Sequence, residues 1–492
     1  MQNKESQYKK IFIGAILLLW FIPIMQQIYP FVAEKSLSGD IQYEQDTTLS
    51  ANAWFDGAYS SQKEKYINEN FGFRNFCIRL KNQLYFYLLN IPKAKDIVIG
   101  KEDFLYEEKY IKSYTGVDFI GENAIRRNVE KLKFITDTLE KLKISLIVLF
   151  APGKASYYPE FIPEKYFVGS DTTNTNYKWT VRIAEQLHLK YIDYNVLFRN
   201  KKSASTYPLY PKTGIHWSVY GMYYAVDTLI KYIETTRAKK MAHFNYDKVE
   251  LSYDLRYEDG DIAEGLNMFS NILPFKMAYP IVHYEDTLNA YKPRVLVIAD
   301  SYWKGIHFTF LPKRIFGKNE FWYYNRQIFD YSDEHGDPEE LDLKKEIESK
   351  DVIILMATEA DVKEIGWDFI DEAYDLYSKG EGSIADRRKR ALIKRIKKQM
   401  TFNPEWHFKL QQDANEKKIT LDSEMTVNAV WLIDNDPAFK LKQSPIENIK
   451  RNMRSDPQWM KEIERKANDN KISVDSMMTR DAIWMGRKEK EN

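Results

Sequence analysis

The pattern of apolar and polar residues predicts an α/β fold in the middle of the chain. Short, mainly aliphatic runs are typical of strands buried on both faces of a parallel sheet, and such runs lie at residues 144–150, 190–193, 294–299 and 352–356. Apolar residues at spacings of three and four predict helices at residues 122–142, 176–187 and 218–233. Helices that alternate with strands in this order predict a doubly wound, mainly parallel sheet with helices on both faces.

Residues 11–32 form a long apolar segment that follows Lys4, Lys9 and Lys10. A helix of about 22 residues spans roughly 33 Å, which is enough to cross the hydrocarbon core of a bilayer. The preceding lysines predict a cytoplasmic N-terminus and an exported main domain, in a periplasm or outside the cell. A cleaved signal peptide is the alternative. No small-x-small cleavage site follows the run, so we favour an uncleaved single-pass anchor in the inner (cytoplasmic) membrane.

Between this segment and the predicted sheet the chain is polar and aromatic. We expect a spacer from residue 33 and a helix at 74–89. A hairpin is expected at 96–106, where a Gly-Lys-Glu-Asp turn separates two apolar stretches. Residues 240–290 are irregular, and no elements are assigned to them.

The C-terminal part of the chain contains a repeated pattern. Pro404 and Trp406 recur as Pro457 and Trp459, and several later positions repeat at the same offset of 53 residues. Each unit begins like a helix, with Asn or Asp at the cap and proline at the first helical position. Two helical hairpins are therefore expected. The basic segment at 387–398 is expected to be a solvated helix face rather than a site for acidic polymers or lipid headgroups.

These patterns divide the chain into four parts. They are a cytoplasmic tip and membrane anchor at 1–32, a spacer and helical entry segment at 33–95, an α/β domain at 96–378 and a helical repeat at 379–492. A length of 492 residues suits two folded domains with accessory segments.

Composition narrows the possible partners and cofactors. The formal net charge of +1 gives no electrostatic reason to expect binding to nucleic acid. The single cysteine, Cys77, cannot form an intrachain disulfide, so it does not indicate the redox compartment. No pair of histidines has the helical spacing of a metal site, and we expect none.

Ser301 and His216 are the candidate catalytic pair. Ser301 directly follows the run at 294–299, so it lies at the carboxyl end of a buried strand, where parallel sheets bind ligands. His216 lies in a loop that precedes a predicted helix. A serine hydroxyl becomes a strong nucleophile when a neighbouring base takes its proton, and the backbone N–H groups of the turn at Ser301 would stabilise an oxyanion.

Two short blocks around this pair resemble a known family. The stretch Ala-Asp-Ser-Tyr at 299–302 resembles the Gly-Asp-Ser block of SGNH hydrolases. The stretch Gly-Ile-His-Trp-Ser at 214–218 resembles the Asp-x-His-Trp block of their alginate O-acetyltransferase branch, the AlgX and AlgJ group. The resemblance covers about residues 50–375 and implies an SGNH hydrolase-like α/β/α fold. It also implies that Ser301 is the nucleophile and His216 the base.

The chain departs from this family where the family's aspartate falls on Gly214. A carboxylate normally orients the histidine of such a site. Asp193, at the end of the preceding strand, is our candidate replacement, because Asp300 would point away from Ser301 if the strand continued. The residues expected to contact substrate are Lys154, Trp217 and Tyr302.

The resemblance implies an exported, membrane-anchored O-acetyltransferase that acts on an envelope or exported polysaccharide. Ser301 would accept an acetyl group from a membrane-bound O-acyltransferase partner and pass it to a polysaccharide hydroxyl. No cofactor is expected, because the acyl-enzyme carries the group. Two alternatives stay open: a polysaccharide acetyl-esterase, and a polysaccharide-binding or scaffolding subunit with impaired catalysis, which Gly214 would favour.

Overall fold

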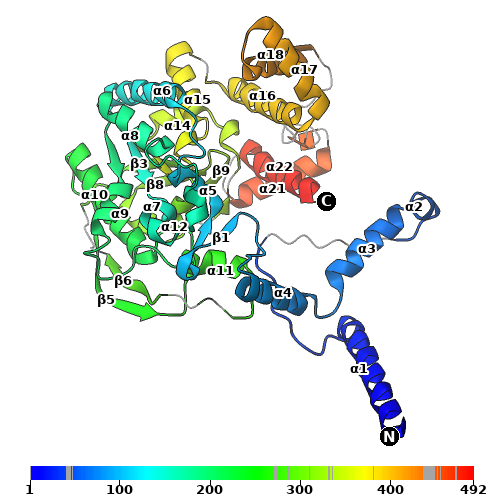
Figure 1. The fold of residues 1–492 in the computed structure, drawn as a ribbon. Helices are drawn as coiled ribbons and strands as arrows, with labels where there is room; N and C mark the ends of the chain where they lie inside the picture. The colour runs from blue at the N-terminus through cyan, green and yellow to red at the C-terminus, as the bar shows by residue number, and fades with distance from the viewer. Residues whose placement is uncertain are drawn as a thin grey trace.

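The computed structural model places an α/β domain between two helical regions, with helices α1 to α3 projecting on one side and α16 to α22 on another (Figure 1). It describes residues 2–491 except 40–45, 47, 271, 273–274, 285–288, 310, 331–332, 335, 381, 436–448, 451–452, 455 and 471–473.

The central sheet has seven strands in the order β10-β9-β8-β7-β11-β3-β4. Five neighbouring strands are parallel and agree with the expected doubly wound arrangement: β8 (Lys318–Tyr323), β7 (Arg294–Ala299), β11 (Val352–Thr358), β3 (Ser145–Ala151) and β4 (Tyr191–Asp193). The edge strands β9 (Gln327–Asp330) and β10 (Asp333–Glu334) run antiparallel, so the sheet is mixed. Strand β8 escaped prediction because it carries Asn319 and Glu320, which are buried polar residues in its apolar run.

Side chains of the central strands alternate between two apolar cores, one on each face of the sheet. In β3, Ile147 and Leu149 join one core, while Val148 and Phe150 join the other. Helices α9 (Tyr194–Lys201), α10 (Val219–Arg237) and α12 (Ser301–Phe308) contribute to the first core. Helices α6 (Glu122–Lys141), α8 (Asn176–Gln186), α14 (Leu343–Glu348) and α15 (Phe369–Lys379) contribute to the second. The result is a three-layer α/β/α fold.

Two small hairpins flank the sheet. The expected hairpin near residue 100 is confirmed as β1 (Ile97–Ile99) paired with β2 (Leu105–Glu107). The segment left unassigned in the sequence contains β5 (Phe244–Ser252), helix α11 (Asp261–Gly265) and β6 (Met277–Tyr284). Strands β5 and β6 pair antiparallel, and β5 is mostly solvent-facing, which explains its weak hydrophobic signal.

The N-terminal region is helical. Helix α1 spans Gln2–Ile28, and its segment Lys9–Ile28 is the one described helix that is long and apolar enough to cross a membrane. Helices α2 (Ala51–Phe55) and α3 (Ala58–Asn70) follow, and the expected helix at 74–89 is confirmed as α4 (Arg74–Leu89).

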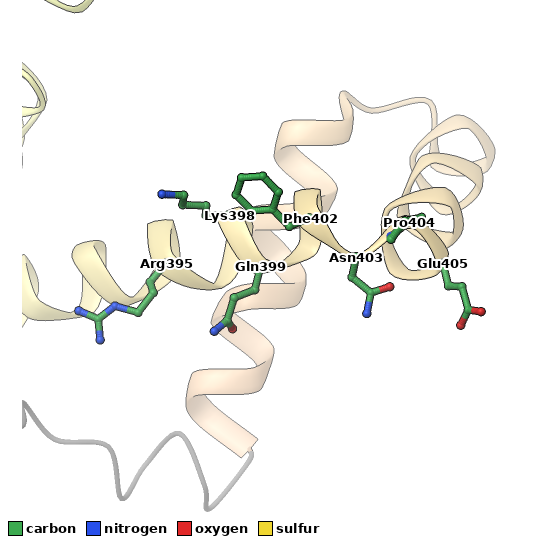
Figure 2. Close-up of a pocket in the computed structure, with 7 residues that line it drawn as sticks. All are labelled: Arg395, Lys398, Gln399, Phe402, Asn403, Pro404 and Glu405. Carbon is green, nitrogen blue, oxygen red and sulfur yellow. The ribbon is translucent and has the colours of Figure 1, made fainter. Parts of the chain in front are cut away.

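The C-terminal region is also helical. It contains α16 (Ile384–Phe402), α17 (Pro404–Lys417), α18 (Leu421–Asn435), α21 (Pro457–Asn470) and α22 (Val474–Glu491). Asn403 and Asp456 accept from the N–H groups of Trp406 and Trp459, each at 3.1 Å, as N-caps do. The repeat itself stays a prediction. A hollow of about 790 Å³ lies on α16 and the start of α17. Its lining residues, which include Arg395, Phe402 and Glu405, are drawn in Figure 2.

The expectation of a solvated basic face at 387–398 is wrong for Arg387 at the start of α16, whereas Lys389, Lys394, Arg395 and Lys398 are exposed. The guanidinium of Arg387 is buried and donates to Glu372 Oε2 at 3.0 Å and to the carbonyl oxygen of Leu341. Arg388 and Arg390 form ion pairs with Glu340 and Asp375. These contacts fix α16 to the α/β domain.

Candidate active site

Ser301 lies where strand β7 gives way to helix α12. Asp300 caps this helix: its carboxylate accepts from the N–H of Tyr302 at 3.0 Å and from the N–H of Thr358 at 2.7 Å. As expected, Asp300 does not contact the Ser301 hydroxyl. The abrupt change from strand to helix leaves Ser301 partly exposed at the carboxyl edge of the sheet.

The structure brings His216 to Ser301. The Nε2 atom of His216 lies 2.9 Å from Ser301 Oγ, and the ring is 8% exposed. His216 belongs to the loop that leads into α10, whose first turn is capped by Ser218 as the sequence indicated. The orientation suits a base that takes the serine proton.

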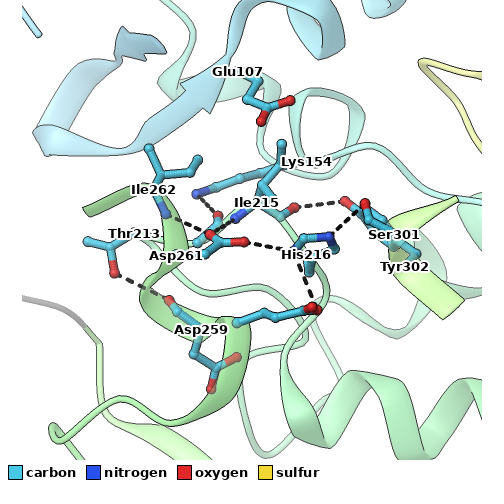
Figure 3. Close-up of polar contacts among 12 residues, drawn as sticks. Glu107, Lys154, Thr213, Ile215, His216, Asp259, Asp261, Ile262, Ser301 and Tyr302 are labelled. Atoms are coloured by element: carbon cyan, nitrogen blue, oxygen red, sulfur yellow. Dashed lines mark hydrogen bonds and ion pairs between the residues drawn. The ribbon is translucent and has the colours of Figure 1, made fainter. Parts of the chain in front are cut away.

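A carboxylate completes the hydrogen-bond chain, and it comes from Asp261. The Nδ1 atom of His216 lies 2.7 Å from Asp261 Oδ2, so the three side chains are joined in sequence (Figure 3). Asp261 is the first residue of α11, and its other oxygen accepts from the N–H groups of Ile215 and Ile262 at 2.9 and 2.7 Å. Backbone contacts on one oxygen therefore aim the other at His216.

The position of the missing family aspartate is filled by backbone. A Cβ atom on Gly214 would lie 2.5 Å from the carbonyl oxygen of Glu258 and 2.7 Å from that of Asp259. The segment that carries Asp261 thus packs against the place where an aspartate side chain at 214 would begin. The segment at 258–261 therefore excludes an aspartate side chain at position 214 and supplies the carboxylate of Asp261 in its place.

The charges around His216 raise its pKa above the ordinary value. Burial disfavours the imidazolium, but the hydrogen bond to Asp261 and the negative charge of Glu258 outweigh this effect. Glu258 lies 3.5 Å from Nδ1 of His216, and burial in turn raises the pKa of the Glu258 carboxyl. His216 is thus set to hold the proton that it would take from Ser301.

The expectation that Asp193 orients His216 is wrong. Asp193 caps α9 by accepting from the N–H of Val196, and it accepts from the hydroxyl of Tyr177 at 2.7 Å. It lines a separate groove of about 990 Å³ beside the edge strand β4. The position of Asp193 at a strand end does not bring it to His216, because β4 lies at the sheet edge, three strands from β7.

The three residues expected to contact substrate are buried supports instead. Lys154 is fully buried and donates to the carbonyl oxygens of Lys212 and Gly214 at 2.7 and 2.6 Å, which holds the His216 loop in place (Figure 3). Burial lowers the pKa of Lys154 well below its ordinary value. Tyr302 donates to the carbonyl oxygen of Ile215, and Trp217 packs against the Tyr302 ring.

Tyr324 is a further polar group beside the serine. It follows β8, the parallel neighbour of β7, and its hydroxyl lies near Ser301. Of the turn's backbone donors, the N–H of Tyr302 is already taken by Asp300. The N–H of Ser301 at the start of α12 is therefore the donor of this turn that is left for a developing oxyanion.

The sequence analysis missed Asp261, Glu258 and Tyr324. The acidic stretch Glu-Asp-Gly-Asp at 258–261 was a visible signal, but it lies in the segment to which no element was assigned. Among the described residues, no group of three or more His, Cys, Asp or Glu side chains could hold a metal ion.

A Ser-His-Asp hydrogen-bond chain at the strand ends of an α/β sheet defines the class of serine hydrolases and acyltransferases. Residues 97–275 match the family model described as the SGNH hydrolase-like domain of acetyltransferase AlgX. His216 and Asp261 fall inside the matched residues, and Ser301 falls beyond them. A search of curated proteins finds no match.

A search of solved structures finds distant matches. The O-acetyltransferase domain of Pseudomonas putida AlgJ is 16% identical, with a TM-score of 0.38, and the match covers 57% of this chain and 98% of that one. Pseudomonas aeruginosa AlgX is 14% identical, with a TM-score of 0.39 and coverage of 57% and 67%. Bacillus cereus PatB1 is 13% identical, with a TM-score of 0.30 and coverage of 49% and 91%.

Proposed function

We propose that this chain is an O-acetyltransferase that transfers acetyl groups to hydroxyls of an envelope or exported polysaccharide through an acetyl-serine intermediate. The hydrogen-bond chain from Ser301 through His216 to Asp261 carries this proposal. The family of the domain at 97–275, an acetyltransferase family, supports the acetyl group as the cargo.

In the first half-reaction, Ser301 Oγ attacks the carbonyl carbon of an acetyl donor while His216 Nε2 takes the serine proton. Asp261 stabilises the resulting imidazolium. The tetrahedral oxyanion accepts a hydrogen bond from the N–H of Ser301. The bond to the donor's leaving group then breaks, and that group leaves with the proton from His216.

In the second half-reaction, a sugar hydroxyl attacks the acetyl-serine carbonyl. His216 takes the hydroxyl proton and returns it to Ser301 Oγ as the ester bond to serine breaks. The products are the acetylated sugar and free Ser301. Water can replace the sugar hydroxyl, and the protein would then act as an esterase.

We propose that this reaction takes place outside the cytoplasm. Helix α1 would anchor the chain in the cytoplasmic membrane, and the segment Lys9–Ile28 has the length and mean hydropathy, 2.1, for this role. The acetyl donor would be a membrane-bound O-acyltransferase partner. We propose domain boundaries after residues 32, 95 and 378. We also propose that α17–α18 and α21–α22 are two copies of one hairpin unit.

The test is release of p-nitrophenol from p-nitrophenyl acetate by the full chain in detergent, followed by acetyl transfer to an oligosaccharide read by mass spectrometry. Ser301→Ala and His216→Ala should abolish both reactions. Asp193→Asn is the matched control and should keep them, because Asp193 does not contact His216. Absence of wild-type turnover with both acceptors would reject the proposal in favour of a polysaccharide-binding subunit.

A further inference from the structure

Helix α4 carries an apolar stripe that is largely exposed, with Phe76 at its start packed against the ring of Phe269. Phe76, Leu80, Leu84, Tyr87 and Leu88 recur at spacings of three and four, so they share one face of the helix. Their exposed fractions run from 42% at Leu80 to 73% at Leu88. Exposed apolar residues are ordinary when scattered, but a continuous stripe on one helix marks an interaction surface.

The opposite face of α4 is fixed to the α/β domain by polar contacts. Arg79 donates to the carbonyl oxygens of Met268 and Ser36, and Asn82 donates to that of Leu266 at 2.8 Å. Arg79 and Asn82 are both buried. The helix is therefore held in a defined orientation, and the apolar stripe points away from the domain as a consequence.

The start of α4 also touches the end of the apolar helix α1. A Cβ atom on Gly72 would lie 2.1 Å from the carbonyl oxygen of Pro23, so the two backbones meet closely there. Phe73 packs edge-on against Phe31 at 5.9 Å, and it also contacts Phe76 at the head of the stripe. In the view of Figure 1, α4 lies on the side of the domain from which α1 extends, and it runs across the direction of α1.

Basic side chains flank the stripe. Lys81 is the one charged residue on the exposed face of α4, and Lys93 and Lys95 follow the helix and are exposed. An amphipathic helix with apolar residues on one side and lysines at its margin is suited to the boundary between lipid headgroups and acyl chains. Long lysine side chains reach from this depth to the headgroups.

We propose that α4 lies on the outer surface of the bilayer that α1 enters, with its apolar stripe inserted at the headgroup boundary. This inference rests on the proposed role of α1 as an anchor. Helix α4 is hydrogen-bonded to the residues just after α11, and α11 carries Asp261. Lipid contact by α4 would therefore hold the candidate active site in a fixed orientation above the membrane. A membrane-delivered acetyl donor would then meet Ser301 from a constant direction.

Cys77 allows a direct test, because it is the only cysteine of the chain and lies exposed beside the stripe. A nitroxide on Cys77 of the full chain, reconstituted in phosphatidylcholine and phosphatidylglycerol vesicles, is measured for collision with oxygen and with a water-soluble nickel chelate. We expect a higher oxygen-to-nickel ratio than for a nitroxide on Glu416→Cys in a Cys77→Ser background. Glu416 is exposed on α17.

Substitutions separate lipid contact from anchoring. Leu80→Asp with Leu84→Asp should lower the Cys77 ratio to the control value, while the chain still floats with vesicles through α1. The same variant should keep full turnover of p-nitrophenyl acetate, since neither leucine lies in the active site. The matched control is Phe402→Asp with Phe408→Asp, two exposed apolar residues elsewhere, which should leave the ratio unchanged.

Three results would overturn the proposal. One is a water-exposed Cys77 label on a chain that still floats with vesicles, since this would show that α1 anchors the chain but α4 does not contact lipid. Another is spin–spin broadening at Cys77, which would show that a second copy covers the stripe. The third is failure of the wild-type chain to float, which removes the anchor as well. Loss of esterase turnover in the wild type would instead reject the proposed function and leave the lipid contact standing.

Discussion

At the scale of single residues, the site depends on which residue supplies the carboxylate that contacts His216. Asp261 reaches His216 from α11, and the carbonyl oxygens of the preceding residues occupy the space beside Gly214. An orienting aspartate two positions before the histidine would compete for the same place. The pair of Gly214 and Asp261 thus gives the same chemical contact by a different chain path.

Asp261→Asn should reduce kcat/KM sharply, by about 10⁴-fold if the serine protease template applies. The same change should shift the rising limb of the pH profile to lower pH. His216 acts as a base only when neutral, so activity rises with pH through its pKa, which Asp261 holds above the ordinary value. Removing that hydrogen bond leaves burial to lower the pKa.

Initial rates with p-nitrophenyl acetate between pH 5 and 9 would measure this shift. Glu258→Gln serves as a comparison, because Glu258 also raises the pKa of His216 but lies farther from Nδ1. It should move the limb in the same direction with a smaller loss of rate. An unmoved limb in Asp261→Asn would mean that Asp261 does not pair with His216 in solution.

Gly214→Asp should not rescue Asp261→Asn. The new Cβ atom would overlap the carbonyl oxygens of Glu258 and Asp259, and relief of such a clash typically costs about 1–3 kcal/mol. Urea unfolding of the single variant would measure the lost stability. Gly265→Ala is the control, because a Cβ atom there meets nothing within 4 Å. Recovery of turnover in the double variant would contradict the steric argument.

At the scale of elements, the active site joins the end of β7 to two loops that precede helices. Lys154, from the short helix α7 (Lys154–Tyr157) after β3, holds one of these loops through two backbone carbonyls. The site is thus assembled from three segments whose relative positions depend on contacts underneath it. A change to such a support alters geometry without touching substrate.

Lys154→Met keeps the length of the side chain but removes both donors. Two buried carbonyls then lose a partner, which costs about 1–3 kcal/mol for each unsatisfied group. We expect a lower thermal midpoint together with reduced kcat, because the His216 loop loses its support. Differential scanning calorimetry and steady-state kinetics measure the two effects. Lys165→Met, at an exposed lysine, is the control and should change neither.

At the scale of the whole molecule, α16 couples the C-terminal helices to the α/β domain through the buried pair of Arg387 and Glu372. Burial raises the pKa of Glu372, and the charge of Arg387 opposes that rise. The predicted boundary at residue 379 falls between the two members of this pair. Helix α16 therefore serves the stability of the domain that precedes it.

Arg387→Met should destabilise the chain by about 3–5 kcal/mol, because it leaves the Glu372 carboxylate buried and unpaired. Arg388→Met should cost about 1 kcal/mol or less, since its ion pair with Glu340 is more exposed. A chain that ends at Lys379 should likewise unfold at lower urea than one that ends at Asn435, which keeps α16, α17 and α18. Equal midpoints for the two truncations would show that α16 adds nothing to the domain.

The sequence by itself determined the features that depend on neighbouring residues. The buried strands β3, β7 and β11, the helices α4, α6 and α10, and the Ser218 cap follow from local periodicity and capping. The positions of Ser301 and His216 at the same sheet edge follow from the rule that parallel strands end together. These features require no knowledge of distant contacts.

The tertiary structure alone decided what completes the site. Asp261 lies 45 residues from His216 in an irregular segment, so no periodic signal joins them. Lys154, Trp217 and Tyr302 looked like contact residues, but their burial depends on how loops close over the sheet. Strand β8 buries polar residues whose partners come from elsewhere in the chain, such as Lys350 for Glu320. Contacts between distant residues are fixed by packing, and packing is a property of the folded chain.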